Sequence, residues 1–363
     1  MPPSAFARVA FLVYALLIVY ASWYPFTGWR SAGVSPTAYL LAPLPHYWTM
    51  FDFLTNVIGY APLGLLAVYA LYPKVRGIVA FLLAFIVGVA LSGMMEAVQT
   101  FLPSRVPSNL DLMTNTAGVA MGALIGVVSA DVLLRESWLA LLRRRWFSHQ
   151  ASRGLIVMGL WPLAQIYPQA YFLGHGQVLP MISDKLSQWL SIPVNLGDLL
   201  RHGKQLTVEQ YWLSETIITA CGVSGAVLTL LCVLQDRAPK MFLALSFLLS
   251  AVIVKILASA LQFSPDNAFA WVTPGAQAGF LLGLVMLSGL IFAPPVAQRR
   301  VAALTLVMSL FVINVVPENP YFLATLQAWV QGKFLNFNGA AQFLSLSWPF
   351  LALWFLLHPV HRQ

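Results

Sequence analysis

Residues 51–61 read FDFLTNVIGYA and residues 110–120 read LDLMTNTAGVA, and each stretch opens a long apolar run. Both copies share an Asp, a Thr, an Asn, a Gly and an Ala at the same spacing, as Asp52, Thr55, Asn56, Gly59, Ala61 and as Asp111, Thr114, Asn115, Gly118, Ala120. Residues four apart lie on one face of a helix. The sequence therefore predicts an Asp–Asn pair at the start of two hydrophobic helices, where polar groups are costly and usually functional.

The composition indicates a membrane protein. Hydrophobic residues form 59% of the 363 residues, whereas charged residues form only 9%. We predict an all-α fold, a polytopic transmembrane helical bundle of about ten spans, because ten apolar stretches are long enough to cross a bilayer. They are residues 6–25, 53–72, 77–97, 110–132, 154–172, 207–234, 241–262, 275–294, 301–317 and 340–357. The first stretch ends in bulky residues, which favours a retained helix over a cleaved signal peptide.

Basic residues are distributed unevenly between the predicted loops. The side that carries both termini holds Arg8, Lys74, Arg76, Arg135, Arg143, Arg144, Arg145, Arg153, Arg237, Lys240, Arg299, Arg300 and Arg362. The other side holds Arg30, Arg105, Lys185, Arg201, Lys204 and Lys333. The positive-inside rule then predicts that both termini are cytoplasmic. The formal net charge of +8 therefore requires no nucleic-acid partner, and the arginine run at 143–145 is interpreted as an anchor near anionic lipid.

The order of the predicted spans suggests two membrane domains. Residues 1–132 form a four-helix domain, residues 133–153 a basic cytoplasmic linker, and residues 154–363 a six-helix domain. In the first domain, the hairpins 6–72 and 77–132 would be parallel repeats, as in some transporters. Chance matching of small residues is the alternative reading of the shared motif.

Two short segments have the pattern of surface helices. MISDKLSQWLS at 181–191 alternates apolar and polar groups as expected for a helix lying flat at the membrane interface. Residues 321–331 are a second candidate of this kind. Thr207 with Gln210 three residues later predicts a capping box that opens the sixth span.

Eight polar residues map near the outer ends of the second, third and fourth predicted spans: Asp52, Asn56, Glu96, Gln99, Arg105, Ser108, Asp111 and Asn115. Glu96 stands in the last turn of its helix, where an acid is unfavourable, and Arg105 in the following loop is the nearest compensating group. Arginine binds carboxylate or phosphate in a planar, two-pronged contact, so Arg105 could pair with an internal acid or with a ligand's phosphate. Asp52 and Asp111 also stand where helix N-caps are expected.

The second domain offers fewer candidate residues. Glu215 and Lys255 fall at similar depth on neighbouring antiparallel spans and are predicted to form an internal ion pair, with a Lys that reaches the interface as the alternative. The six histidines are dispersed along the chain, so we expect no metal site. We recognise no nucleophile motif and no phosphate-cradling loop, and we therefore expect no cofactor.

The run DFLTNVIGYAPLG at 52–64, followed by EAVQTFLPSRVPSNLDLMTNTAGVAMG at 96–122, resembles the VanZ family. The resemblance covers roughly residues 6–132. It implies a small polytopic protein of the bacterial plasma membrane with a role in the cell envelope. The founding member is associated with resistance to the glycopeptide antibiotic teicoplanin, and the family offers no catalytic residues to transfer. The six predicted C-terminal spans go beyond the short form of the family.

Three classes of function follow. The first is binding or handling of an amphipathic or lipid-linked envelope component, such as a membrane lipid, a lipid-linked glycan or a cell-wall component, at an outward-facing polar site. The second is a membrane-embedded enzyme that acts on a lipid-linked substrate, with Glu96 or Asp111 as the general base. The third is a structural or partner-binding membrane protein.

Overall fold

The computed structural model describes residues 5–31, 33–134, 145–148, 151–263, 265–317 and 335–358, and these ranges are helical without any strand. The chain divides into two compact units, Met1–Arg145 and Trp146–Gln363, which we describe separately. The predicted linker, 133–153, falls across this division. Most of that linker and the predicted surface helix at 321–331 lie outside the described residues.

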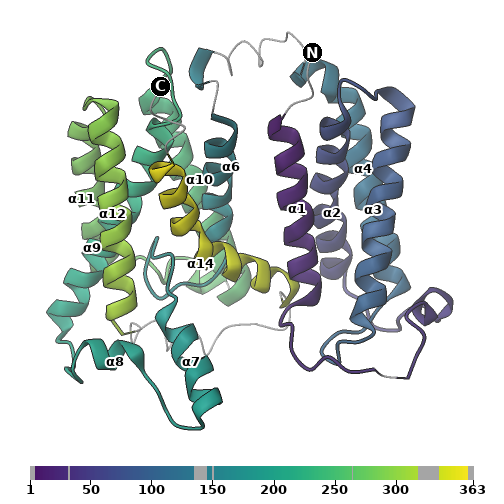
Figure 1. Ribbon diagram of the computed structural model, residues 1–363, viewed down its shortest axis with the longest axis horizontal. Coiled ribbons are helices and arrows are strands. Elements are labelled where there is room, and N and C mark those ends of the chain that lie inside the picture. The colour runs from purple at the N-terminus through teal and green to yellow at the C-terminus, as the bar shows by residue number, and fades with distance from the viewer. Residues whose placement is uncertain are drawn as a thin grey trace. The chain divides into compact units, whose positions relative to one another are not determined.

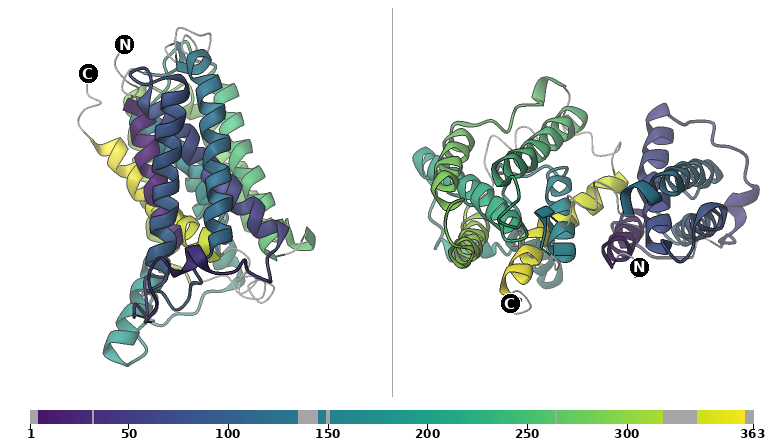
Figure 2. Two further views of the ribbon diagram at one scale, coloured as in Figure 1. Left: turned by 90° about the vertical axis from the view of Figure 1, so that its right-hand side faces the viewer. Right: turned by 90° about the horizontal axis from the view of Figure 1, so that it is seen from above.

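Unit 1 is a bundle of four helices that run side by side (Figure 1, Figure 2). They are α1 (Ala5–Trp23), α2 (Met50–Leu71), α3 (Gly77–Gln99) and α4 (Asn109–Leu134), with the short 3-10 helix η1 (Ala38–Leu41) between α1 and α2. In Figure 1, α1 begins and α4 ends at the same end of the unit. The loop between α3 and α4 lies at the opposite end, next to the start of α2.

The helices that carry the repeated motif pack directly against each other, because glycines let their backbones approach. A Cβ atom on Gly118 would overlap the carbonyl of Val57, and one on Gly122 would overlap the carbonyl of Ala61. From the other side, Gly64 of α2 lies against the backbone of α4. Small residues commonly permit such close contacts between membrane helices. These glycines therefore bring the motifs of α2 and α4 together.

Unit 2 is built around a central helix, α9 (Val208–Leu231). About α9 lie α6 (Ala151–Ala164), α10 (Lys240–Phe263), α11 (Pro274–Leu290), α12 (Pro295–Val315) and α14 (Leu335–Leu357), with the 3-10 turn η2 (Pro265–Asn267) after α10. In α9, 14 of the 24 residues are buried, whereas in α10 only 8 of 24 are buried, so α9 forms the core and α10 leaves a broad apolar face exposed. The predicted capping box opens α9: the Thr207 side chain accepts from the Gln210 N–H, and the Gln210 side chain accepts from the Thr207 N–H.

Eight of the described helices are long and apolar enough to cross a membrane, and the protein is a multi-pass helical membrane protein. The two remaining predicted spans, 154–172 and 275–294, correspond to shorter helices of 14 and 17 residues, α6 and α11. α6 ends at Ala164 because the chain then enters a buried irregular segment, residues 165–178, which the hydropathy pattern did not reveal.

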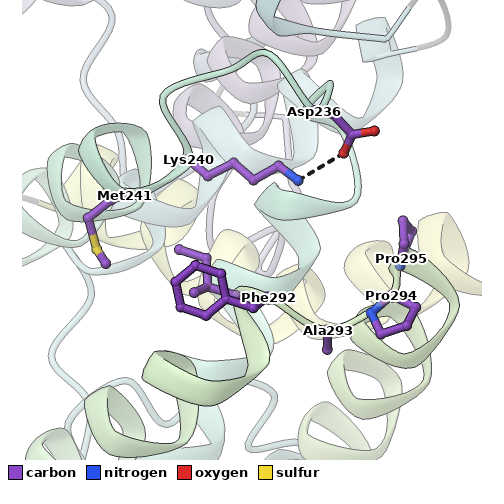
Figure 3. Close-up of a pocket in the computed structure, with 8 residues that line it drawn as sticks. Asp236, Lys240, Met241, Phe292, Ala293, Pro294 and Pro295 are labelled. Atoms are coloured by element: carbon purple, nitrogen blue, oxygen red, sulfur yellow. Dashed lines mark hydrogen bonds and ion pairs between the residues drawn. The ribbon is translucent and has the colours of Figure 1, made fainter.

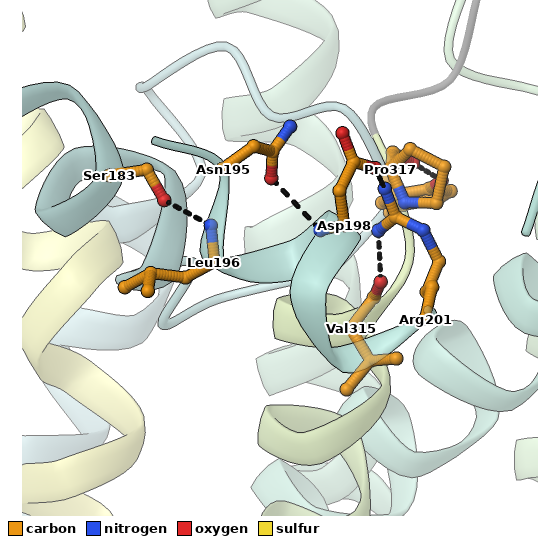
Figure 4. A network of polar contacts seen from close by, with 8 residues as sticks. Ser183, Asn195, Leu196, Asp198, Arg201, Val315 and Pro317 are labelled. Atoms are coloured by element: carbon orange, nitrogen blue, oxygen red, sulfur yellow. Dashed lines mark hydrogen bonds and ion pairs between the residues drawn. The ribbon is translucent and has the colours of Figure 1, made fainter. Parts of the chain in front are cut away.

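The predicted interfacial segment is a helix, α7 (Leu179–Leu190), followed by the short helix α8 (Leu196–Leu200). Figure 4 shows how the pair is held: the Ser183 hydroxyl oxygen accepts from the Leu196 N–H at 3.1 Å, and Arg201 donates to the Val315 carbonyl at the end of α12. Trp189 remains 82% exposed. The helix is therefore confirmed, while its position at the membrane interface stays a prediction.

Candidate functional site

A buried carboxylate joins α3 to α4. Glu96 is 3% exposed, and its Oε2 atom accepts a hydrogen bond of 2.8 Å from the backbone N–H of Ser108. The Ser108 hydroxyl oxygen accepts in turn from the N–H groups of Leu110 and Asp111, so Ser108 caps α4. The start of a helix carries unpaired N–H groups and a partial positive charge. Glu96 is therefore compensated by the N-terminus of α4.

The expectation that Arg105 pairs with Glu96 is wrong. The Arg105 guanidinium donates to the Tyr24 carbonyl, from Nη2 at 2.6 Å and from Nε at 3.1 Å, and to the Ala21 carbonyl at 3.2 Å. These carbonyls end α1, where helical carbonyls lack an intrahelical donor. Burial lowers the pKa of Arg105 and the Glu96 charge acts in the opposite direction, so the two groups interact through space without contact. Arg105 caps the end of α1, and its Nε–Nη2 edge is therefore occupied and does not offer a two-pronged contact to a phosphate.

The repeated Asp–Asn pairs meet across helices, but not symmetrically. The Asn56 side chain on α2 donates to Oδ1 of Asp111 on α4 at 2.9 Å. Asn115 instead donates to the Ser92 hydroxyl on α3 at 3.0 Å, and its own Oδ1 atom is buried without a hydrogen-bond partner. We call Asn56, Ser92, Glu96, Asp111 and Asn115 the acidic cluster.

Two of the predicted site residues lie outside this cluster. Asp52 is exposed and forms a capping box with Thr49, with hydrogen bonds of 3.1 and 3.2 Å. Gln99 is buried and donates to the Ser22 carbonyl near the end of α1 at 3.1 Å. The N-cap assignment of Asp52 and Asp111 is also wrong, because Thr49 and Ser108 are the caps. Both acids occupy the first helical turn, where a negative charge is still favourable.

The sequence reading missed Ser92 and Tyr39. Ser92 stands four residues before Glu96, so helical spacing alone would have placed it on the same face of α3. Tyr39 of η1 reaches over the same end of the unit, and its hydroxyl donates to the Gly93 carbonyl at 3.1 Å. No periodic signal could have found Tyr39, because it lies in the short 3-10 helix η1, far from α3 in the sequence.

The acidic cluster is rich in hydrogen-bond acceptors. It contains two carboxylates and one unpartnered amide oxygen, and no described Lys or Arg forms an ion pair with it. Within the described residues, no three His, Cys, Asp or Glu side chains are placed to hold a metal ion. Groups that accept but do not donate suit a ligand with hydroxyl or amine donors. The site chemistry therefore differs from the phosphate recognition that a free Arg105 would have provided.

The predicted Glu215–Lys255 ion pair is not formed. Glu215 is 2% exposed, interacts with the Thr273 side chain and lies against Gly275 at the start of α11. Lys255 is 4% exposed, and its charge acts on His175. The sequence pattern places both residues at a similar depth in the membrane, but in the structure their side chains face different neighbours. The spacing along antiparallel helices fixes height, whereas rotation about each helix axis decides which side chains meet.

A surface hollow of unit 2 lies where α10 begins and α11 turns into α12 (Figure 3). Its polar groups are Lys240 and Asp236, which form an ion pair at 3.1 Å on the surface. Exposed pairs of this kind contribute little binding energy. The hollow contains no buried polar group and is a weaker candidate than the acidic cluster.

Fold and site together define a polytopic helical membrane protein with a buried acidic cluster at one end of its N-terminal unit. Residues 11–130 match the VanZ/LLP1 family model, a range that contains the whole acidic cluster. The chain thus carries a VanZ-like N-terminal domain, as the motif predicted, followed by additional C-terminal helices. No curated protein and no solved structure matches the chain.

Proposed function

We propose that the VanZ-like domain binds or handles an amphipathic or lipid-linked component of the cell envelope at the acidic cluster. One observation carries this proposal: Glu96, Asp111 and Asn115 present acceptor oxygens from two adjoining helices, and the Asn115 oxygen has no protein donor. Buried polar atoms without a partner are rare and call for an explanation. A ligand that donates hydrogen bonds provides one.

The chemistry of the acidic cluster limits the chemical class of its ligand. The Nε–Nη2 edge of Arg105 is engaged by the carbonyls at the end of α1, so this edge is not available for a two-pronged contact with a phosphate. Sugar hydroxyls or a primary amine would donate to carboxylate and amide oxygens, and the apolar helix faces would accommodate acyl or polyprenyl chains. A lipid-linked glycan and an aminophospholipid headgroup both have this combination of donors and lipid.

We propose further that the protein lies in the bacterial inner membrane with cytoplasmic termini, so that the acidic cluster opens to the outside. The uneven distribution of Lys and Arg supports this orientation. In a variant without Cys221 and Cys232, Ser104→Cys should react with a membrane-impermeant thiol reagent in intact cells, whereas Lys74→Cys should react only after permeabilisation. Both sites are exposed and lie at opposite ends of unit 1. The opposite labelling pattern would reverse the proposed orientation.

The functional test distinguishes the loss of charge at the acidic cluster from a loss of folding. Glu96→Gln and Asp111→Asn preserve shape while removing charge, so both variants should insert and melt within a few degrees of the parent. Each should lose the lipids or glycans that mass spectrometry detects on the gently purified parent. Asp131→Asn is the matched control, because Asp131 lies on α4 near its other end and accepts a bond from Tyr72 there. That control should retain the same molecules as the parent.

Other outcomes distinguish the alternatives. If Glu96→Gln still retains the molecule but no longer converts it to a product seen with the parent, the domain is an enzyme with Glu96 as its acid or base. If neither substitution changes what is retained, or if both variants fail to accumulate in the membrane, the cluster is structural and the proposed function is wrong.

A further inference from the structure

The surface hollow of unit 2 lies where two membrane spans begin (Figure 3). Lys240 is the first residue of α10, Pro295 is the first residue of α12, and residues 291–294 form the turn that joins α11 to α12. All three parts line the hollow, which has a volume of about 480 Å³. The ends of apolar spans lie near the boundary between the hydrocarbon core and the headgroups of a bilayer. The hollow therefore lies at the depth of the lipid headgroups.

The wall of the hollow is mainly apolar. Phe292 is 85% exposed, and Met241 is exposed as well, so both present free apolar surface. The volume is within the range of about 300–1,000 Å³ that is usual for small-molecule sites, which are also mostly apolar. Six lining residues have no polar side-chain group: Met241, Ile291, Phe292, Ala293, Pro294 and Pro295.

The turn between α11 and α12 satisfies its own backbone. The buried Gln298 side chain donates to the carbonyls of Leu290 and Ile291, at 3.0 and 3.1 Å. Pro294 and Pro295 have no N–H group that would need an acceptor. Backbone groups in contact with hydrocarbon must be satisfied inside the protein, because lipid tails offer no hydrogen bonds. This turn is therefore suited to contact with a lipid.

The apolar wall continues along α10 beyond the hollow. Met241, Leu245 and Leu249 follow one another at four-residue spacing and so share a face of the helix. All three side chains are exposed. An acyl chain that begins at Met241 can therefore follow this face into the bilayer, whereas a soluble ligand would make no use of it.

The charged groups at the rim are mostly positive. Lys240 and Asp236 form an ion pair at 3.1 Å, in which the Lys240 side chain is 26% exposed and the Asp236 side chain 96%. Arg237 and Arg300, which stand within five positions of lining residues, are also exposed. An exposed ion pair contributes little free energy. Lys240 can therefore exchange Asp236, which remains in water, for another anion.

We propose that this hollow binds an anionic phospholipid, with the phosphate on Lys240 and an acyl chain along Met241, Leu245 and Leu249. Lysines and arginines close to a membrane surface attract anionic lipids, and the apolar wall supplies contacts that a soluble phosphate cannot use. A zwitterionic aminophospholipid is the competing occupant, and the excess of positive charge favours the anionic lipid. The site lies outside residues 11–130 and belongs to the C-terminal unit, so it is separate from the acidic cluster.

A fluorescent label in the hollow tests the proposal. In the full-length protein without Cys221 and Cys232, Ala293→Cys would carry a bimane label in nanodiscs of phosphatidylcholine. Bromine atoms on an acyl chain quench the label on contact, so a small fraction of brominated phosphatidylglycerol is compared with an equal fraction of brominated phosphatidylcholine. Phosphatidylglycerol should bind with about fivefold higher apparent affinity, roughly the contribution of one lysine at an anionic lipid surface.

Matched lysine variants assign this preference to the hollow. Lys240→Met should lower the preference for phosphatidylglycerol about fivefold. Lys185→Met, which removes an exposed lysine of α7, should leave the preference unchanged. If Lys240→Met does not accumulate, Lys240→Gln decides in its place. A parent without the preference, or a Lys240 variant that keeps it, overturns the proposal.

Two further comparisons identify other occupants. Asp236→Asn removes the competing carboxylate, so it should maintain or raise the preference for phosphatidylglycerol. If brominated phosphatidylethanolamine quenches most strongly and Asp236→Asn weakens that quenching, the occupant is an aminophospholipid and the proposal is wrong.

Inorganic phosphate in place of chloride, at equal ionic strength, should leave the quenching by phosphatidylglycerol unchanged. A loss of quenching would assign a soluble phosphate ligand and overturn the lipid site. Glu96→Gln should keep the preference for phosphatidylglycerol, so this site and the acidic cluster fail or succeed independently.

Discussion

The Oε2 atom of Glu96 and the backbone N–H of Ser108 are joined by a hydrogen bond of 2.8 Å, which connects the last turn of α3 to the first turn of α4. An acid at the C-terminus of one helix is unfavourable there, but it is stabilised by the N-terminus of the next. The short loop between the two helices allows this arrangement. The same bond places a buried carboxylate beside Asp111 and so creates the acidic cluster.

The first prediction concerns this bond. Ser108→Gly removes the capping hydroxyl but keeps the N–H, whereas Ser108→Pro removes both. We expect Ser108→Pro to destabilise unit 1 by about 2–3 kcal/mol more than Ser108→Gly, because hydrogen bonds to charged groups are worth roughly that much. Thermal unfolding in detergent measures the difference. In a Glu96→Ala background, the extra destabilisation of Ser108→Pro over Ser108→Gly should largely disappear. If this difference is the same in both backgrounds, the hydrogen bond to Glu96 contributes nothing to stability.

The second prediction concerns the contact between α2 and α4. Gly122→Ala places a Cβ atom against the backbone carbonyl of Ala61, which cannot move as a side chain could. We expect a loss of about 1–3 kcal/mol, the usual cost of overpacking. Gly159→Ala in α6 is the control, because nothing lies within 4 Å of its added Cβ. The control should melt at or slightly above the temperature of the parent, and equal melting of both variants would contradict the close packing.

The third prediction concerns Glu215 and Lys255. Because Glu215 contacts the start of α11 and Lys255 does not contact Glu215, the effects of Glu215→Gln and Lys255→Met on the free energy of unfolding should add. The double variant should match the sum of the single variants within about 0.5 kcal/mol. If the double variant is more stable than Lys255→Met alone, Glu215 and Lys255 do form an ion pair, and the arrangement described above is wrong.

The fourth prediction concerns pH. The pKa of His175 is depressed in the folded protein to about 3, from a usual value of 6.5. The unfolded chain therefore binds the proton more readily, so the contribution of His175 is fully present above pH 6.5 and is lost as the pH falls toward 3. The expected loss is roughly 1.4 kcal/mol per pH unit within that window.

Replacement of His175 measures this contribution directly. The melting temperature of a His175→Gln variant should depend less on pH between 6.5 and 4.5 than that of the parent, whatever its stability at pH 7.5. His46→Gln is the control, because His46 is exposed. If His175→Gln and the parent lose stability in parallel as the pH falls, the buried neutral histidine is not responsible.

The acidic cluster was only partly predictable from the sequence. Helical spacing placed Asn56, Asp111 and Asn115 at one end of the bundle. Asn56 and Asp111 meet there in a hydrogen bond, whereas Asn115 instead donates to Ser92 on α3. The pairing of Glu96 with the N–H of Ser108, and of Arg105 with the end of α1, depended on how the loop folds. A charge in a loop can reach several partners, and sequence spacing does not decide among them.

The sequence by itself determined the membrane class, the helical fold, most of the spans and the VanZ-like domain, because hydropathy and helical periodicity are local properties that each segment carries alone. The tertiary structure decided that α6 stops at Ala164, that residues 165–178 are buried without being helical, and that Glu215 and Lys255 face different neighbours. These features depend on the rotation and packing of helices far apart in the chain. Whether a polar group is buried, and which group it bonds to, is decided only when all of the helices around it have packed.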